Sequence, residues 1–328
     1  MFCNAECPPL HAGGHFAGVR CVLSSFRVHP HRLLAYLPYG ARLCGSYDGA
    51  WLFLASDQSI GHELINVRTG ETHRLPEWIH YDLGVDGGER RLHRIAYLAG
   101  TLSCQPGDWG SIGGAVFGAE EGPAFQAEDV LYHAQDHTFY FLTGGEHVFI
   151  ATPVRLPGGG LRIDWARRYY EAGREYQHHP AAAYIVLSDE DLLMVVRFKA
   201  TAEDPTTSSF RVFVFSVVEG EGTGDNAAWV WTELPTLGGR ILFLGRGCSR
   251  SYHAGSYPGC DEGVYFLDDN KEDLDMMFED RRERLYSGFD NGRWSLPRAA
   301  LRCASLQIFR PARCTRRRRG CSPETTCA

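Results

Sequence analysis

The chain has 328 residues, 44% hydrophobic and 12% aromatic, which is enough for one large domain or two ordinary ones around a substantial core. Its net charge of −7 is uneven, because residues 298–328 carry eight arginines and one glutamate, while residues 1–297 carry a net charge of −14. The acidic body argues against nucleic acid as a partner, since such binding depends on neutralising phosphates. No apolar stretch approaches the ~20 residues that a membrane helix needs, which argues against a membrane.

The cysteine content bears on the cellular compartment. There are 11 cysteines, an odd number, and no Asn-x-Ser/Thr sequon. Residues 1–9 are polar and contain two cysteines, unlike the apolar run of a signal peptide. These features predict a reduced, intracellular protein of the cytoplasm or nucleus, in which most cysteines are small buried hydrophobic residues.

Residues 1–39 show no sustained hydrophobic period. Leu33, Leu34 and Leu37 are followed by Pro38, which stops any helix there. We therefore predict an irregular lead-in that adds at most an edge strand, and no leucine-spaced helical module of the F-box kind.

A series of short β-strands is predicted from residue 43 onward. Asp48-Gly49 and Thr69-Gly70 have the composition of tight turns between apolar runs. The predicted strands that follow them lie at 92–102, 129–132, 138–142 and 148–150. Further along, the acidic turn 188–191 separates two apolar runs and predicts a hairpin.

Residues 210–267 contain four apolar runs joined by turns. The first, 210–215, alternates strictly between the two faces of a strand. The others cover 228–231, 240–245 and 263–267. We predict that the four runs form one antiparallel sheet with a tryptophan-rich face.

Leu-Pro pairs suggest how these strands are grouped. The pairs stand at 37–38, 75–76, 156–157, 234–235 and 296–297. The first three spacings fit one or two units of about 40 residues, the size of a propeller blade, and the last spacing does not. Together with short strands and frequent glycine turns, this predicts an all-β, β-propeller-like array of about six short antiparallel blades over residues 40–297, possibly incomplete.

Residues 298–328 form a basic tail with four cysteines and little apolar content. Weak surface ion pairs cannot offset the entropy of ordering about thirty residues, so we predict a disordered tail outside the domain. Leu306 to Phe309 is the one stretch that could add a strand and close a ring. The Arg316–Arg319 run is consistent with a nuclear import signal or with a basic tail of no specific function.

No metal site is predicted. Cys3 and Cys7 have an acceptable spacing but no second close pair, and Cys248 and Cys260 are twelve residues apart. The paired histidines at 29/31 and 178/179 are isolated. The acidic run 268–275 lacks the glycine and glutamate of a calcium loop.

No catalytic or cofactor-binding residue is predicted either. The sequence 247–251 ends in serine instead of the glycine of a nucleophile elbow. Arg246 and Arg250 flank Cys248, a setting that can activate a thiol, and His253 is near in sequence. The favoured interpretation of Cys248 is a packing residue.

The aromatic residues are predicted to fill the core, as is usual in β proteins. Tryptophans at strand or turn positions are predicted to lie mostly in the core: Trp51, Trp109, Trp229, Trp231 and Trp294. A few of them at the propeller mouth could instead serve as binding hot spots. A set from the alternating runs is predicted to be mostly buried: Trp51, Phe53, Tyr140, Trp231, Phe243 and Tyr265.

Several motifs occur in the order found in one plant family. The motifs are Gly45-Ser46 with Trp51-Leu52, Cys104-x-Pro106-Gly107-Asp108, Glu233-Leu234 with Leu237-Gly238, Arg240 to Gly245, Cys248-Ser249, Tyr257-Pro258-Gly259 and Asp268-Asp269. Over 42–296 the chain resembles the plant DUF295 family, also described as the KIB1-4 β-propeller domain, whose members are often F-box proteins.

The resemblance implies a non-enzymatic protein-interaction platform. In F-box members such a domain would recruit a substrate to a Skp1–cullin ubiquitin ligase, with the partner on the propeller face. Here no F-box is recognised, so the expected protein is an F-box-less paralogue or a truncated form, and we predict no stable Skp1 complex. The alternative is a propeller-fold hydrolase or lyase, for which no motif was found.

Overall fold

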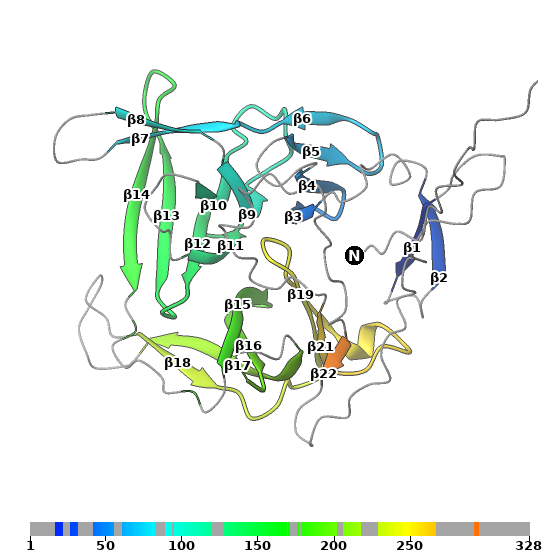
Figure 1. Cartoon of the computed structure of the whole chain (residues 1–328). Helices are drawn as coiled ribbons and strands as arrows, with labels where there is room; N and C mark the ends of the chain where they lie inside the picture. The colour runs from blue at the N-terminus through cyan, green and yellow to red at the C-terminus, as the bar shows by residue number, and fades with distance from the viewer. Residues whose placement is uncertain are drawn as a thin grey trace, which may run out of the picture.

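The computed structural model of the chain consists of β-strands and one 3-10 turn over the residues that it describes (Figure 1). Those residues are 17–21, 27–31, 42–55, 61–82, 89–93, 95–119, 127–168, 170, 176, 179–201, 206–217, 229–266 and 292–294. Cys3, Cys7, His178, the acidic run 268–275 and the tail 298–328 lie outside them, so the predictions made for these positions stay predictions. The same holds for the domain boundaries at 39/40 and 297/298.

Four sheets of four or more strands contain most of the described strands. The first has the order β10-β9-β3-β4-β5-β6: β10 (Gly113–Ala119), β9 (Ile95–Leu102), β3 (Arg42–Tyr47), β4 (Trp51–Ala55), β5 (His62–Asn66) and β6 (Thr72–Arg74). The second contains β11 (Ala127–His133), β12 (Thr138–Thr143), β13 (Val148–Arg155) and β14 (Leu161–Arg168) in sequence order.

The third sheet also follows sequence order, with β15 (His179–Ser188), β16 (Asp191–Lys199), β17 (Thr207–Val217) and β18 (Trp229–Glu233). The fourth has the order β20-β19-β21-β22: β20 (Arg250–His253), β19 (Arg240–Leu244), β21 (Gly263–Phe266) and β22 (Gly292–Trp294). The 3-10 turn η4 (Ala254–Ser256) follows β20. Two hairpins stand apart: β1 (Ala17–Cys21) with β2 (Arg27–His31), and β7 (Trp78–Asp82) with β8 (Glu89–His93).

The sheets stand around a common centre, as blades do in a propeller (Figure 1). β3, β9, β11, β15 and β20 come close to one another in that order. The six-stranded sheet spans two sectors of the ring, because a single parallel bridge between Gly45 and Gly100 joins β3 to β9. The predicted all-β, propeller-like fold is confirmed. About six blades, possibly incomplete, were expected, and the structure describes four sheets of blade size.

The acidic hairpin at 188–191 forms as predicted. β15 and β16 pair antiparallel over their whole length and end at the Ser188–Asp191 pair. Asp189 in the turn has φ 55°, a left-handed conformation that Asp tolerates better than most residues. The apolar runs on both sides are buried, so the turn chemistry and the burial select the same register.

The prediction of one antiparallel sheet over 210–267 was wrong. β17 and β18 complete the third sheet, whereas β19 and β21 belong to the fourth, where they pair parallel. Pro235 has no N–H to continue the ladder, and the chain crosses to the next sheet through buried Leu237. β20 pairs with one edge of β19, so β21 takes the other edge and runs parallel to β19.

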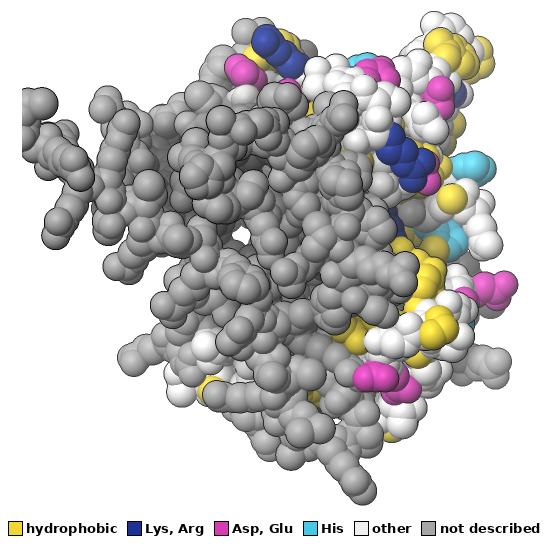
Figure 2. All heavy atoms as spheres, turned by 90° about the vertical axis from the view of Figure 1, so that its right-hand side faces the viewer, with side chains coloured by type: hydrophobic (Ala, Val, Ile, Leu, Met, Phe, Trp, Pro, Cys, Tyr) yellow, Lys and Arg dark blue, Asp and Glu magenta, His cyan; other side chains and the backbone are white. Residues whose placement is uncertain are grey.

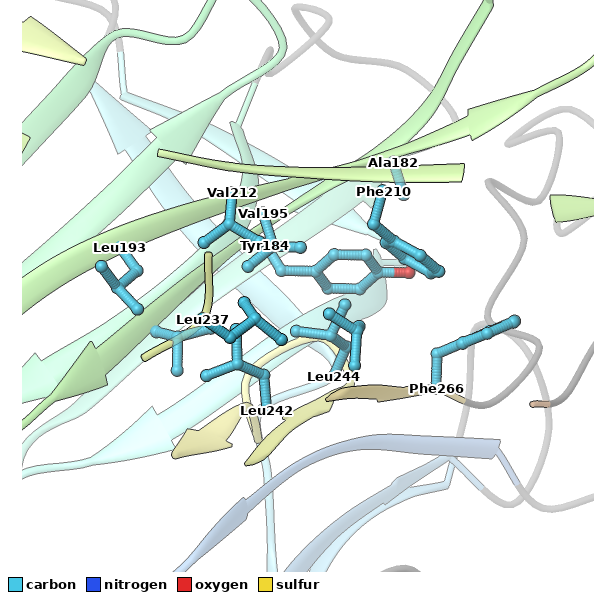
Figure 3. Packing of buried hydrophobic residues seen from close by; sticks show 12 residues of the cluster. Ala182, Tyr184, Leu193, Val195, Phe210, Val212, Leu237, Leu242, Leu244 and Phe266 are labelled. Carbon is cyan, nitrogen blue, oxygen red and sulfur yellow. The ribbon is translucent and has the colours of Figure 1, made fainter. Parts of the chain in front are cut away.

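A large part of the core lies between the third and fourth sheets. Figure 3 shows the ring of Tyr184 surrounded by aliphatic side chains from both sheets, with Phe210 and Phe266 beside it. Phe210 and Phe266 have ring centroids 4.8 Å apart in a tilted arrangement. Burying a side chain of this size contributes roughly 1.5–3 kcal/mol, so this cluster fixes how the two sheets pack.

Most of the aromatic residues predicted to be core residues are buried. Trp51, Phe53, Trp231, Phe243 and Tyr265 are buried, and Tyr140 is partly buried. Trp229 and Trp294 are also partly buried. The prediction for Trp109 was wrong, because 89% of this residue is exposed. Its exposure directs attention to the loop that carries it.

Candidate functional site: an exposed Trp–Arg patch at the rim

Trp109 lies in the loop that joins β9 to β10. Two turns shape this loop: the N–H of Asp108 donates to the carbonyl of Gln105 at 3.2 Å, and the N–H of Ser111 donates to the carbonyl of Asp108 at 3.0 Å. Gly107 supplies a φ of 88°. The backbone is therefore held by its own hydrogen bonds, and the indole of Trp109 contributes nothing to the core that would explain its size.

The hydroxyls of two serines fix the base of the same loop. The N–H of Ile112 donates to Ser103 Oγ at 3.0 Å, and Ser111 Oγ donates to the carbonyl of Cys104 at 3.3 Å. A loop held in this way presents Trp109 in a defined place, with little conformational entropy left to lose on binding.

Arg155, the last residue of β13, covers one side of the indole. Its guanidinium carbon lies 4.8 Å from the centroid of the Trp109 ring. A Cβ at position 110 would lie 2.9 Å from Arg155 Nη2, so Gly110 leaves the space that the arginine occupies. The pair is a cation–π contact between two sheets of the ring.

The β13–β14 turn supplies the remaining apolar surface. Leu161 is the cross-strand partner of Arg155 and shares its face, and Leu156 follows Arg155. Leu156 is 40% exposed and Leu161 is 48% exposed. Hydrogen bonds between Leu156 and residues 159 and 160 close the turn. We call Trp109, Arg155, Leu156 and Leu161 the rim patch.

Arg155 differs from its basic neighbour in its charge environment. Arg162 donates to both carboxylate oxygens of Asp164, at 2.8 and 3.0 Å, so the guanidinium of Arg162 is already engaged. Arg155 makes no ion pair with any carboxylate in the described part of the chain. An exposed arginine with open donors is ready to accept a carboxylate or phosphate.

The described side chains that Figure 2 shows do not concentrate a single charge. Figure 2 views one side of the molecule, and the described side chains along its right-hand margin mix hydrophobic, basic, acidic and histidine groups. The exposed large hydrophobic residues among the described ones are Leu43, Trp78, Trp109, Leu156, Leu161 and Trp165. Three of these six belong to the rim patch, which is why we single it out.

The centre of the ring contains a second unusual group, the carboxylate of Asp129 in β11. Asp129 is 1% exposed. Its Oδ1 accepts the backbone N–H groups of Val130 at 2.8 Å and Gly247 at 2.6 Å, and its Oδ2 accepts that of Ile185 at 2.9 Å. These donors come from β11, β15 and the loop after β19, so one side chain ties three sheets together.

Burial dominates the electrostatics of this carboxylate. It raises the pKa of Asp129 from 3.8 to about 7, while the three backbone donors and the charge of Arg246 oppose the rise. A buried acid with a perturbed pKa can mark an active site. Here the three amide donors already occupy the oxygens of Asp129. These complete hydrogen bonds favour a structural role for Asp129, in which it holds the sheets together.

The loop 245–249 reaches from β19 toward the middle of the ring (Figure 1). Gly247 adopts φ 64°, and a Cβ there would lie 2.5 Å from the amide nitrogen of Gly100 and 3.1 Å from the carbonyl oxygen of Cys44. The carbonyl of Gly247 also accepts the N–H of Ser46 at 3.4 Å. This position requires glycine, because the backbone of β9 and β3 in the first sheet approaches it too closely for any side chain.

Two of the side chains near Cys248 in the sequence, Arg250 and His253, have partners other than the thiol. Its Sγ would lie 2.7 Å from a Cβ at Gly245, so the thiol packs onto that glycine. Arg250 donates to the carbonyls of Ser249 and Ser46, and His253 Nε2 lies 3.1 Å from Asp189 Oδ2. The packing role of Cys248 stays a prediction, and the contact of its thiol with Gly245 is consistent with it.

The described residues also bear on metal binding and membrane insertion. Among the described residues, no three His, Cys, Asp or Glu side chains gather in a way that could hold a metal ion. Cys260 is buried and Cys248 half-buried, and neither forms a disulfide bond. In the described ranges, no helix is long and apolar enough to cross a membrane.

The ring of mostly antiparallel sheets with a loop at its centre defines the chain as a β-propeller protein. The model of the KIB1-4 β-propeller family matches residues 22–287, and the chain therefore belongs to that family. Comparisons with curated proteins and with solved structures gave no significant match.

Sequence reasoning missed both features for identifiable reasons. Trp109 was assigned to the core by residue type, although the Pro106-Gly107-Asp108 turn just before it indicated a surface loop. Asp129 begins an apolar strand, and an acid next to buried valine could have signalled a buried polar anchor. The most distant of its three donors, the N–H of Gly247, lies 118 residues away, and no local pattern reveals such a contact.

Proposed function

We propose that this chain is a non-enzymatic protein-interaction platform whose rim patch contacts a protein partner. The observation that carries the proposal is Trp109, which is 89% exposed and stacked against Arg155. Tryptophan and arginine are the residues most enriched in binding hot spots. An indole that contributes nothing to the core and is held on a fixed loop is better explained by binding than by stability.

The propeller fold supports this function. Its sheets form a rigid scaffold, and the loops between them carry binding residues without strain on the core. The rim patch draws on two such loops, β9–β10 and β13–β14, from different sheets. A partner bound there would contact both sheets at once.

Affinity purification with three forms of the full chain tests the proposal. We expect wild type and Trp165→Ala to capture the same partner and Trp109→Ala to lose it. Trp165 is a matched control, because it is 61% exposed on β14 and contacts Phe141 without a cation over its ring. Equal capture by all three forms would contradict the rim patch as the binding surface.

Enzymatic activity is tested on the same purified protein. A screen for bound metal and for ester, phosphate and glycoside hydrolysis should give no activity above that of Asp129→Asn. Turnover that disappears in this variant, while its thermal midpoint stays unchanged, would favour the hydrolase or lyase alternative.

The relation to ubiquitin ligases is a separate prediction. We expect no stable Skp1 complex, since residues 1–39 lack leucines spaced as in a helical module. A pull-down that recovers Skp1 with the full chain, and loses it when residues 1–39 are deleted, would restore the ligase role.

A further inference from the structure

The rim patch has a charge and a shape that restrict what can bind to it, and this inference rests on the function proposed above. The guanidinium of Arg155 lies over one side of the indole at 4.8 Å. Since Trp109 is 89% exposed, the rest of the ring is open to a ligand. An arginine held against an aromatic ring keeps its planar fork oriented, which suits two-point recognition of a carboxylate.

The charged residues nearby leave the guanidinium of Arg155 available to bind a carboxylate. Arg162, seven residues further along, is held by Asp164 through two hydrogen bonds. Residues 156–161 carry no charge, and the β9–β10 loop carries the single acid Asp108. Arg155 is therefore the one cation of the rim patch, and it makes no ion pair with a described residue.

The apolar side of the patch is smooth. Leu161 lies across the strand pair from Arg155, and Leu156 lies beside it. Gly158 and Gly159 have φ values of 107° and 90°, and a Cβ on either would meet nothing within 4 Å. The tip of the turn thus projects no side chain, so an extended segment can pass over it close to Trp109.

The charge of the whole chain limits how acidic the ligand can be. Residues 1–297 carry a net charge of −14, so a highly acidic partner is repelled as it approaches. A ligand with one carboxylate meets Arg155 and little of this repulsion. The patch therefore selects a single acid in an apolar setting and disfavours a run of acids.

We propose that the rim patch binds a short peptide segment of a partner protein in which one Asp or Glu lies next to a large apolar side chain. The carboxylate accepts hydrogen bonds from the guanidinium of Arg155. The apolar side chain packs on the open part of Trp109 and on Leu161. Neither group alone covers the patch.

A random twelve-residue peptide library displayed on phage tests this inference. The library is selected on the immobilised full-length chain, with counter-selection on Arg155→Gln. We expect the enriched peptides to share one acid within two positions of Leu, Phe or Trp. Enrichment without an acid, or of peptides with three or more acids in a row, would overturn the inference.

Fluorescence anisotropy with one labelled peptide from the selection then measures the contributions. Replacing its Glu by Gln, or using Arg155→Gln or Trp109→Ala, should each weaken binding at least tenfold. Arg162→Gln and Trp165→Ala are matched controls expected to stay within twofold of wild type. Thermal midpoints of all variants should agree, which separates lost contacts from lost folding.

The remaining outcomes distinguish this inference from the proposed function. If no peptide is enriched, the inference fails. A protein captured by wild type but not by Trp109→Ala would still support the platform function with a different ligand chemistry. If peptides bind equally to Arg155→Gln and Trp109→Ala, the rim patch fails both as their site and as the proposed hot spot.

Discussion

The Asp129 centre and the rim patch are opposites in how their polar groups are satisfied. At the centre, three amide donors from different segments occupy one buried carboxylate. At the rim, an exposed guanidinium rests on an exposed indole and makes no ion pair with a described residue. The comparison teaches that a charged side chain with all its hydrogen-bond partners in place indicates a structural role, whereas an exposed one without an ion-pair partner indicates a binding role.

The largest effect is expected from Asp129→Ala. The change leaves three buried N–H groups without an acceptor, and each such group costs roughly 1–3 kcal/mol. The free energy of unfolding should fall by more than about 3 kcal/mol, measured by urea denaturation. Asp164→Ala is the matched control on an exposed carboxylate, expected to stay within about 1 kcal/mol of wild type. If both variants lose the same small amount of unfolding free energy, Asp129 does not hold the sheets together.

Trp231→Ala tests whether a buried tryptophan behaves differently from the one at the rim. Trp231 is buried, and its Nε1–H donates to the carbonyl of Glu146 at 2.9 Å. Loss of the ring should cost roughly 3–5 kcal/mol in urea denaturation. A change within experimental error would place this side chain outside the core.

The raised pKa of Asp129 makes its contribution to the stability of the protein depend on pH. The folded pKa of about 7 lies above the ordinary 3.8, so the folded state binds more protons between these values. The contribution of Asp129 to stability is then complete below about pH 4 and is lost as the pH rises through 7, by no more than about 1.4 kcal/mol per pH unit.

This pH dependence is measured as a difference between two proteins. The unfolding free energy of wild type minus that of Asp129→Asn should decline between pH 5 and 7 and level off above pH 8. The subtraction removes the other titrating groups, which are common to both. A difference that stays level over this range would mean that the folded pKa is not raised to about 7. If Asp129→Asn does not fold, the carboxyl carbon shift of Asp129 in wild type gives the pKa directly.

The smallest effect on stability is expected from Trp109→Ala. The indole is exposed, and its contact with Arg155 contributes only about 0.5–1 kcal/mol. Thermal and urea midpoints should therefore remain close to those of wild type while partner binding is lost. A stability loss as large as that of Trp231→Ala would show that the rim tryptophan supports the fold.

Much of the local structure is predictable from the sequence. The hairpin at 188–191 and the strand beginning near Phe210 follow from turn residues and strict alternation, both local signals. The sheet to which a strand belongs is less predictable. β20 occupies one edge of β19, so β21 pairs with the other edge, and tertiary packing decides which strand takes which edge.

The candidate site divides in the same way. The composition of the loop around Trp109 is a local signal for surface exposure, although aromatic residues usually lie in the core. Its contact with Arg155 links residues 46 positions apart, and the sequence gives no sign of it. The three donors to Asp129 likewise meet only when the ring is assembled, so neither constellation could be deduced from spacing.

The distance along the chain between Asp129 and Gly247 also has a consequence for synthesis. The two residues are 118 positions apart, so Asp129 leaves the ribosome long before its last donor exists. At about 5–20 residues per second, the carboxylate stays hydrated for roughly 6–24 s of elongation. During that interval the second and third sheets can form while the centre remains open. A nascent chain stalled before Gly247 should therefore be cleaved readily by protease between its sheets, and one stalled well past the fourth sheet should resist.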